Sequence, residues 1–425
     1  MKKETRPKFI FHIDVNSAFL SWSALEQLKE DPQSVDLRRI PSAVAGDVNN
    51  RHGIITAKSI PAKAYGIQTA EPVVSALEKC PQLVLVKGDF LAYRRYSDAF
   101  ISLLREYSPI LQQLSIDEAF LDVTARCSGK GECGRQQAIA LAHEMRKQIY
   151  DNLGFTVNVG IAQNKLLAKM ASDFTKPDRV HTLFPEELNE KFLPLPIEEL
   201  YGCGPSTAKR LRTLGLCTIG EVAECSLEIL QSHLGKKAGQ YIYESTHGIG
   251  SDVVQTEKRK AKSYSNETTT PVNVTGDNYD SMGMPIVEKL AAQVSTRLQR
   301  DGVVAKTIFV QVKTREFQRY SRQTTLLRGI NRAEEMAHVA KMLLDELLLG
   351  PEGLFARGEQ IRLLGVGGSH LDDGKYNQLT LWDLADAQKE YQEERQKEQK
   401  QQKAENMMEK IRQRFGDDAI SKGQS

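Results

Sequence analysis

The clearest alternation of apolar and polar positions lies near the N-terminus, over residues 9–14. A period of two residues predicts a half-buried β-strand, with Asp14 at its C-terminal end. A helical spacing of apolar residues follows at once over residues 18–28. Asn16 or Ser17 suits the N-cap of that helix, whereas Asp14 lies too early in the chain to cap it. We therefore expect Asp14 to be free for chemistry.

A second apolar stretch, residues 111–123, contains the adjacent carboxylates Asp117 and Glu118. Its apolar residues have no helical spacing, which predicts a buried strand or hairpin. Two buried anions would repel each other and lose hydration, and the run contains no Lys or Arg to compensate them. A divalent metal is the simplest compensation, since hard cations bind carboxylate oxygens. The alternative is a turn whose acids face water, and the spacing alone does not decide between the two.

The remaining pattern predicts a mixed α and β chain. Helices are expected over residues 91–107 and 136–152, and a strand over 155–161. Helical segments follow over 185–248, and a polar stretch over 246–262 is typical of a tether. Beyond it, the order strand, helix, strand, strand, helix, strand predicts a split β-α-β-β-α-β unit.

Composition restricts the class of protein. The 425 residues suffice for two to four domains, and the formal net charge of +2 means that any basic character must be local. The six cysteines form no Cys-x-x-Cys pair, which argues against zinc and disulfides and fits a reducing cytoplasm. The polar N-terminus is no signal peptide, and no apolar run is long enough for a membrane span. We expect a cytoplasmic protein.

Several ordered motifs together resemble the Y-family DNA polymerases, the translesion class that includes DNA polymerase IV and the catalytic subunit of polymerase V. The motifs are HIDVNSAF at residues 12–19, SIDEAFLD at 115–122, VGIAQNKLLAK at 159–169, and Lys176-Pro177. The resemblance runs with gaps from about residue 9 to about residue 367. It implies an α+β right-hand polymerase with palm, fingers, a helical thumb containing a helix-hairpin-helix, and a β-α-β-β-α-β little-finger domain.

The resemblance also implies domain boundaries and a reaction. The expected domains are the palm at 1–20 and 87–176, fingers at 21–86, thumb at 177–247, linker at 248–261, little finger at 262–367, and a clamp-binding peptide with charged tail at 368–425. The expected activity is template-directed, low-fidelity DNA synthesis without proofreading. Asp14, Asp117 and Glu118 would hold two Mg²⁺ ions, with the Val15 carbonyl as a further ligand, in the two-metal arrangement of nucleotidyl transfer. The competing hypothesis is a non-catalytic DNA-bound scaffold that recruits replication or repair proteins.

Four residues are expected at the incoming deoxynucleoside triphosphate. The backbone N–H groups of Ala18 and Phe19, at a helix start, suit a phosphate, and the Phe19 ring would exclude a ribose 2′-hydroxyl. Lys63 would grip the triphosphate. Lys165 opens a helix, where a cation opposes the macrodipole, and a bound triphosphate would explain its presence.

This sequence departs from the family at three positions. Ala57 stands where Ser or Thr is common, and Ile60 stands where polymerase IV relatives often have Tyr. Some triphosphate contacts are therefore absent or supplied differently. Asn16 stands where polymerase IV relatives often carry Asp, which favours the polymerase V-like branch, whose members need accessory subunits.

Contacts with primer–template DNA are expected from two regions. Gly202 and Gly204 belong to a Gly-x-Gly-Pro turn that resembles a helix-hairpin-helix, whose N–H groups can hold a DNA phosphate; a plain αα turn is the alternative. The second region is a basic face of the little finger, for which a merely solvated face is the alternative. Its residues are Lys313, Arg315, Arg322 and Arg328, with Arg319.

The segment Gln378, Leu379, Leu381 and Trp382 resembles the short peptide by which bacterial polymerases dock in a sliding clamp. The alternative is an amphipathic segment that packs on its own domain. The charged, Gln-rich run at 385–410 suggests no function. The expected partners are thus DNA, nucleotides, a sliding clamp and polymerase V-type accessory subunits. The protein itself is expected to be a monomer.

Overall fold

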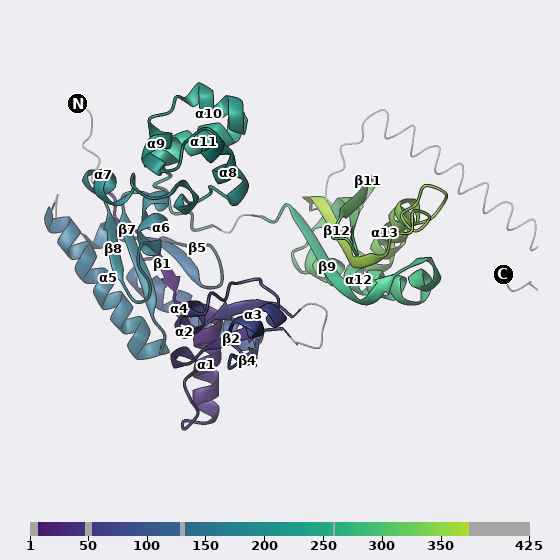
Figure 1. The fold of residues 1–425 in the computed structure, drawn as a ribbon, viewed down its shortest axis with the longest axis horizontal. Coiled ribbons are helices and arrows are strands. Elements are labelled where there is room, and N and C mark those ends of the chain that lie inside the picture. The colour runs from purple at the N-terminus through teal and green to yellow at the C-terminus, as the bar shows by residue number, and fades with distance from the viewer. Residues whose placement is uncertain (1–6, 47–52, 128–131, 258–259, 374–425) are drawn as a thin grey trace, which may run out of the picture. The chain divides into compact units, whose positions relative to one another are not determined.

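A computed structural model describes residues 7–46, 53–127, 132–257 and 260–373, which form two compact units divided at Arg259 and Lys260. The clamp-like peptide at 378–382 and the charged run at 385–410 lie outside the described residues. No helix in the described ranges is long and apolar enough to cross a membrane. Figure 1 shows the elements of both units.

A five-stranded sheet forms the centre of the first unit, in the order β5-β6-β1-β7-β8. Only the β7–β8 pair is parallel. The strands are β1 Ile10–Val15, β5 Leu111–Gln113, β6 Glu118–Asp122, β7 Val157–Ala162 and β8 Val180–Leu183. Four helices accompany this sheet: α1 Ala18–Glu30, α4 Phe90–Tyr107, α5 Glu132–Leu153 and α6 Lys165–Asp173.

The central strand β1 is buried on both faces, so the expected half-buried strand is wrong. Phe11 and Ile13 pack in a core with residues of α4 and α5. Ile10 packs on the opposite face, in a core with residues of α6 and the following helices. Because helices cover both faces, the alternation of residue types along β1 does not mark an exposed side.

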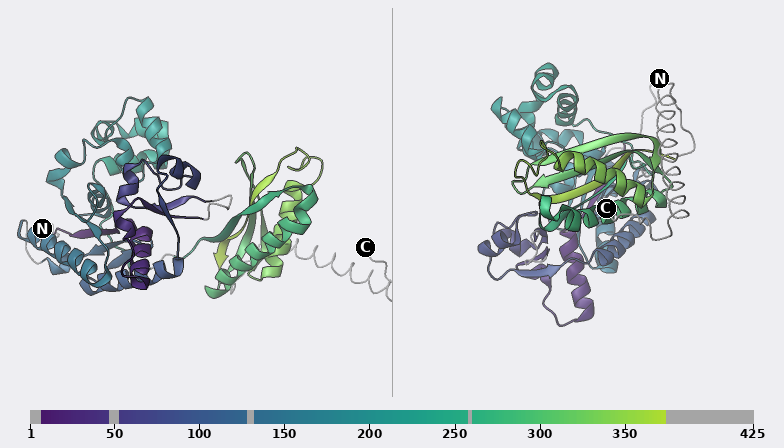
Figure 2. Two further views of the ribbon diagram at one scale, coloured as in Figure 1. Left: turned by 60° about the horizontal axis from the view of Figure 1, so that its bottom comes forward. Right: turned by 90° about the vertical axis from the view of Figure 1, so that its right-hand side faces the viewer.

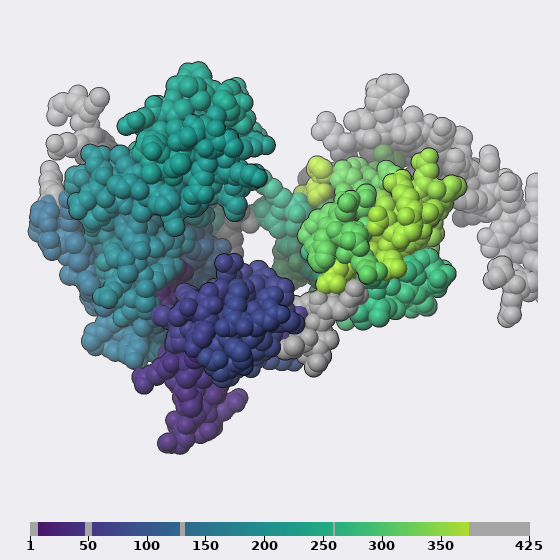
Figure 3. Space-filling view, viewed as in Figure 1, coloured from purple at the N-terminus to yellow at the C-terminus, as the bar shows by residue number. Residues whose placement is uncertain are grey.

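Two smaller groups complete the first unit, and Figure 3 shows them as separate lobes. One is a three-stranded sheet in the order β3-β2-β4 with two short helices. The other consists of helices that begin after β8. The bounds are β2 Ser42–Ala45, β3 Ile55–Lys58, α2 Ile60–Ala64, α3 Val73–Lys79 and β4 Val84–Lys87 for the first group, and α7 Leu188–Lys191, α8 Pro205–Thr213, α9 Ile219–Ala223, α10 Leu227–Leu234 and α11 Lys236–Thr246 for the second.

The second unit confirms the expected β-α-β-β-α-β order. Its strands form a fully antiparallel sheet in the order β11-β10-β12-β9, and α12 and α13 cover one face of it (Figure 2). Ile308, Val310 and Val312 of β10 point into this core, as the alternation predicts. The bounds are β9 Ser263–Val274, α12 Met284–Arg300, β10 Val304–Thr314, β11 Arg319–Ile330, α13 Ala333–Leu348 and β12 Ile361–Asp372.

Candidate active site

Strand register brings the three candidate carboxylates together. Asp14 of β1 lies directly opposite Glu118 of β6. The N–H of Val15 donates to the carbonyl oxygen of Asp117 at 3.0 Å, so the turn of the β5–β6 hairpin is tied to the end of β1. Asp117 and Glu118 are both partly buried. Neither acid is fully exposed, which favours a partly buried cluster over a turn whose acids face water.

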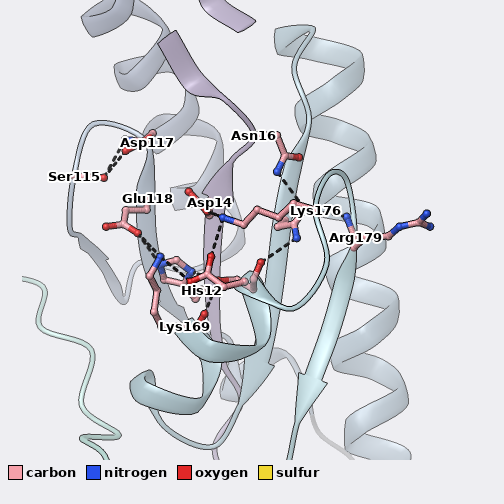
Figure 4. A network of polar contacts seen from close by, with 12 residues as sticks. His12, Asp14, Asn16, Ser115, Asp117, Glu118, Lys169, Lys176 and Arg179 are labelled. Atoms are coloured by element: carbon pink, nitrogen blue, oxygen red, sulfur yellow. Dashed lines mark hydrogen bonds and ion pairs between the residues drawn. The ribbon is translucent and has the colours of Figure 1, made fainter. Parts of the chain in front are cut away.

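Helix α6 covers this part of the sheet because β7 carries a glycine. A Cβ at Gly160 would lie 2.0 Å from the carbonyl oxygen of Ala168 and 2.4 Å from the N–H nitrogen of Ser172. Any side chain at this position would push the helix away from the strand. The close approach brings Lys169 and Ser172 over β1 and β6 (Figure 4).

Glu118 is held by two nitrogen groups. Lys169 Nζ donates to Glu118 Oε2 at 2.9 Å, and His12 Nε2 lies 3.2 Å from the same oxygen without the geometry of a regular hydrogen bond. His12 and then Lys169 lower the pKa of Glu118 to about 2, although burial alone would raise it. His12 is fully buried, which lowers its own pKa, and its Nδ1 bonds with Ser172 Oγ at 2.8 Å.

Asp14 and Asp117 have different partners. Asp14 forms an ion pair with Lys176, whose ammonium also lies 2.8 Å from Asp173. Asp117 accepts a hydrogen bond from Ser115 Oγ at 2.6 Å. Burial, together with the charges of Asp14 and Glu118, raises the pKa of Asp117 above its ordinary value. The cluster therefore retains uncompensated negative charge.

The compensating cations come from outside the carboxylate run. Lys169 lies on α6 and Lys176 follows that helix. The absence of Lys and Arg from residues 111–123 therefore did not predict which cations lie near the carboxylates. Among the described residues, no group of three or more His, Cys, Asp or Glu side chains is spaced to hold a metal. Asp14 and Asp117 nevertheless share one cavity, and burial followed by the charges of Asp14 and Glu118 raises the pKa of Asp117. These oxygen donors fit a hard divalent cation.

A cavity of about 390 Å³ opens beside Asp14 and Asp117. Its volume falls in the range of small-ligand sites. Its walls come from the end of β1, the start of α1, the segment from β3 to Thr69, the hairpin turn and the loop after α6. The lining residues are Asp14, Val15, Asn16, Ser17, Ala18, Phe19, Thr56, Ala57, Lys58, Ile60, Lys63, Thr69, Asp117, Lys176 and Pro177.

Phe19 lines this cavity with a ring that is firmly placed. It is partly buried and stacks on Tyr93, with centroids 4.8 Å apart and planes 12° from parallel. Phe90 meets it edge-on at 5.7 Å. Tyr93 is in turn fixed by a 2.6 Å hydrogen bond with Ser23. The position of the Phe19 ring is thus set by packing.

The expected nucleotide residues do not all meet. Ala18, Phe19 and Lys63 line the cavity, but Lys165 does not. Lys165 Nζ donates to Gln112 Oε1 at 3.1 Å and lies 5.8 Å from the centre of the Phe120 ring. Sequence reasoning assigned no role to Lys176, although it recognised the Lys176-Pro177 motif, and it did not single out Lys58. Both lysines line the cavity.

The expected helix cap is also wrong. Ser17, the residue before α1, has a left-handed backbone and its side chain makes no capping bond. Asn16 instead accepts from Thr156 Oγ1 at 3.0 Å and from the N–H of Asp178 at 2.9 Å, and it donates to Asn158 Oδ1 at 3.2 Å.

Asn158 completes this link. Its amide group donates to the carbonyl oxygens of Ser172 and Thr175, at 2.9 and 2.7 Å, and its Oδ1 accepts from the N–H of Arg179. The Asn16–Asn158 pair therefore ties the end of β1 to the loop that carries Lys176. Figure 4 shows Asn16 and Lys176 near each other.

The expected basic face of the second unit needs a correction. Directly paired residues of antiparallel strands share a face, and Arg322 is opposite the inward-facing Val310. Arg322 thus belongs to the helix-covered face at the sheet edge. Arg328 approaches Glu335 of α13 at 4.0 Å, which places it on that side as well.

Lys313 pairs with Arg319 on the open face, where Glu267 lies 3.9 Å from Arg319; Arg315 is exposed just beyond β10.

The Gly-x-Gly-Pro turn leads into α8. Gly202 has a φ of +87°, and a Cβ there would lie 2.4 Å from the hydroxyl of Tyr241, so this position requires glycine. Gly204 is the N-cap of α8, with open space where its Cβ would be. The N–H groups at this helix start are therefore accessible to a ligand from the Gly204 side.

Comparison with known proteins gives consistent matches along the chain. The impB/mucB/samB family matches residues 13–173, its C-terminal domain residues 261–381, and the DNA polymerase-iota thumb domain residues 198–250. DNA polymerase IV of Clostridium acetobutylicum is 35% identical over 98% of this chain and 97% of that protein. DNA polymerase IV 1 of Bacillus subtilis is 33% identical over 98% and 93%.

A solved Y-family DNA polymerase chimera of Dbh and Dpo4 has a TM-score of 0.72 at 25% identity, covering 85% of this chain and 98% of that one. The two relatives above carry polymerase IV names. The similarity thus gives no support to the polymerase V-like branch that Asn16 favours.

Replacing Asn16 by Asp tests the amide pair. A carboxylate keeps the shape but loses the donor to Asn158, and rotating the Asn158 amide would sacrifice its bonds to Ser172 and Thr175. We expect the free energy of unfolding to fall by about 1–3 kcal/mol in urea denaturation. Thr156→Val is the control, because Asn16 Oδ1 keeps its bond from Asp178; it should cost less. Equal stabilities of Asn16→Asp and the unchanged protein would contradict the role of this pair.

Proposed function

The chain belongs to the Y family of translesion DNA polymerases, and from this premise we propose that Asp14, Asp117 and Glu118 carry its catalysis. The enzyme is a DNA-directed DNA polymerase, in which the primer 3′-hydroxyl attacks the α-phosphate of a nucleotide and pyrophosphate leaves. The alternative of a non-catalytic scaffold finds no support in its relatives. The observation that carries the site assignment is the pairing register that sets Asp14 opposite Glu118 beside a cavity of about 390 Å³.

We propose two Mg²⁺ ions as the cofactors, held by these carboxylates with the Val15 carbonyl as a further ligand. When bound, such ions lower the pKa of the attacking hydroxyl and stabilise the charge of the leaving group. The protein supplies oxygen donors of the right kind, since Asp14, Val15 and Asp117 line the same cavity. Glu118 does not line the cavity, so it would join them only if its carboxylate turned from Lys169.

The protein's own groups would position the nucleotide. Lys63 and Lys176 line the cavity and can contact phosphate oxygens, Lys176 by leaving Asp14. The N–H groups of Ala18 and Phe19 start α1 at the cavity wall and suit a phosphate. Lys165 contacts Gln112, so we propose for it a role in supporting the β5–β6 hairpin in place of a triphosphate contact.

We propose Phe19 as the residue that selects the sugar. Its ring lines the cavity and cannot retreat, because Tyr93 lies flat behind it. A ribose 2′-hydroxyl that met this ring would have no space, whereas a deoxyribose would fit.

We propose the domain boundaries that the sequence predicts. For DNA binding we propose two contact regions. The α8 start at Gly202 and Gly204 would hold one backbone phosphate. The open face with Lys313 and Arg319, flanked by Arg315, would contact others, so affinity should be independent of sequence and sensitive to salt. The edge residues Arg322 and Arg328 can contribute only from the side of the sheet.

We further propose that Gln378, Leu379, Leu381 and Trp382 dock in a sliding clamp, and that the enzyme works in the cytoplasm as a monomer at primer ends. Leu381 and Trp382 have the apolar bulk of interface anchors. A polymerase V-type accessory subunit would be a further partner, suggested by Asn16 alone.

Replacing Asp117 by Asn or Glu118 by Gln tests the catalytic assignment. Each change removes one negative charge without changing size, so Mg²⁺-dependent primer extension should fall on the order of 10³-fold or more. DNA affinity should stay nearly unchanged. Asp98→Asn, an exposed carboxylate of α4, is the control and should retain full activity. Substantial synthesis by either site variant would refute the assignment.

Phe19→Ala should open space beside the sugar. The preference for deoxyribonucleotides over ribonucleotides, measured as a ratio of kcat/KM values, should fall by about tenfold or more. Tyr93→Phe is the control, because it keeps the stacked ring and loses only the bond with Ser23. If Phe19→Ala keeps the preference of the unchanged enzyme, Phe19 is only a packing residue.

Replacing both Leu381 and Trp382 by Ala should leave extension by the free enzyme unchanged and remove its stimulation by an added bacterial sliding clamp. Tethering raises the local concentration of the enzyme at the primer end, and avidity of this kind reaches about 10²–10⁴. Leu384→Ala, just outside the motif, should keep the stimulation. Loss of basal activity in the double variant would show that the segment is structural, and surviving stimulation would place the docking site elsewhere.

A further inference from the structure

We propose that Lys58 is a further ligand of the nucleotide's triphosphate, in addition to Lys63 and Lys176. This inference rests on the proposed function, because it takes the cavity beside Asp14 as the nucleotide site. Lys58 is the last residue of β3, is partly buried and lines that cavity. Its Nζ donates to Thr69 Oγ1 at 3.1 Å, and Thr69 lines the same wall.

Lys58 has no salt bridge with any described residue, unlike the two other lysines near the carboxylates. Lys169 is paired with Glu118, and Lys176 with Asp14. Glu71 is the acid whose charge acts on Lys58, but the Glu71 carboxylate pairs with Lys79 at 2.5 Å. The charge of Lys58 is thus left for a group that the protein does not supply.

The surroundings of Lys58 favour an anion. Its partial burial first, and the charge of Lys63 second, lower the pKa of Lys58. Two ammonium groups that repel each other on one cavity wall are both stabilised when a multivalent anion lies between them. A triphosphate is such an anion, and Asp14 and Asp117 on the palm side of the cavity fix where its reacting end must lie.

The residues next to Lys58 indicate what its side chain would contribute to phosphate binding. Ala57 and Ile60, which lie close to Lys58 in the chain and line the same cavity, have side chains without hydrogen-bond donors. The hydroxyl of Thr56 donates to the carbonyl oxygen of Val44 at 2.9 Å, so the charged side-chain donors of this wall are the ammonium groups of Lys58 and Lys63. Without Lys58, the charge of the phosphates on this wall would be met by Lys63 alone.

Contact with phosphate predicts an effect that is the same for every base. Single-nucleotide insertion by the full chain, on primer–templates with each of the four template bases, should show KM raised about tenfold by Lys58→Met for all four nucleotides. kcat should change less than about threefold, because Lys58 would contribute to binding of the phosphates in the ground state as well as in the transition state. Lys58→Arg keeps a cation and should restore most of the KM.

The matched control is Lys87→Met. Lys87 ends the strand on the other side of β2 and is exposed outside the cavity, so KM should not move. Nucleotide binding measured directly with Ca²⁺ in place of Mg²⁺ should show the same tenfold loss for Lys58→Met. This readout does not depend on turnover.

Three results would overturn the proposal. An unchanged KM and affinity in Lys58→Met would mean that Lys58 only braces Thr69. A loss confined to purine nucleotides would indicate contact with a base edge. A loss that Lys58→Arg does not recover would indicate a packing role. Failure of the unchanged enzyme to insert nucleotides would instead refute the proposed function of the cavity, so the two failures are distinct.

Discussion

The repulsion among Asp14, Asp117 and Glu118 is the constraint on which the rest of the first unit depends. The register of β1 with β6, and the hydrogen bond from Val15 to Asp117, prevent these groups from separating. Compensation must therefore come from elsewhere in the chain, and Lys169 and Lys176 supply it. It is incomplete, because the pKa of Asp117 stays raised by burial and by the neighbouring charges.

The positions of Lys169 and Lys176 depend on residues that carry no charge. Gly160 allows the backbone of α6 to lie directly on β7, which sets the distance from Lys169 to Glu118. The Asn16–Asn158 pair fixes the loop after α6 and with it Lys176. A buried amide pair suits this task, since each amide both donates and accepts without adding charge to an already charged site.

Much of this could be predicted from sequence because it follows from local pattern. The element order of the second unit and the segments that carry the carboxylates all depend on spacing over a few residues. Other features depend on which segments meet in space, and local spacing does not predict them. They are the strand register of Arg322, the hydrogen-bond partner of Lys165 and the position of Lys58 at the cavity. Asn16 shows the limit most clearly: its type suggested a helix cap, yet its partners lie about 140 and more residues away in the chain.

The two lysines at the carboxylates differ in what they can do next. The side chain of Lys169 is 13% exposed, does not line the cavity and lies between Glu118 and Asp173, so its ion pairs stay within the protein. The side chain of Lys176 is 34% exposed and lines the cavity, so under the proposed function a triphosphate would offer it another anion in place of Asp14. Lys176 would still keep an ion pair with Asp173, 2.8 Å away, when it leaves Asp14. Under the proposed function, the same movement would free Asp14 as an oxygen donor, so nucleotide binding would also complete the carboxylate site.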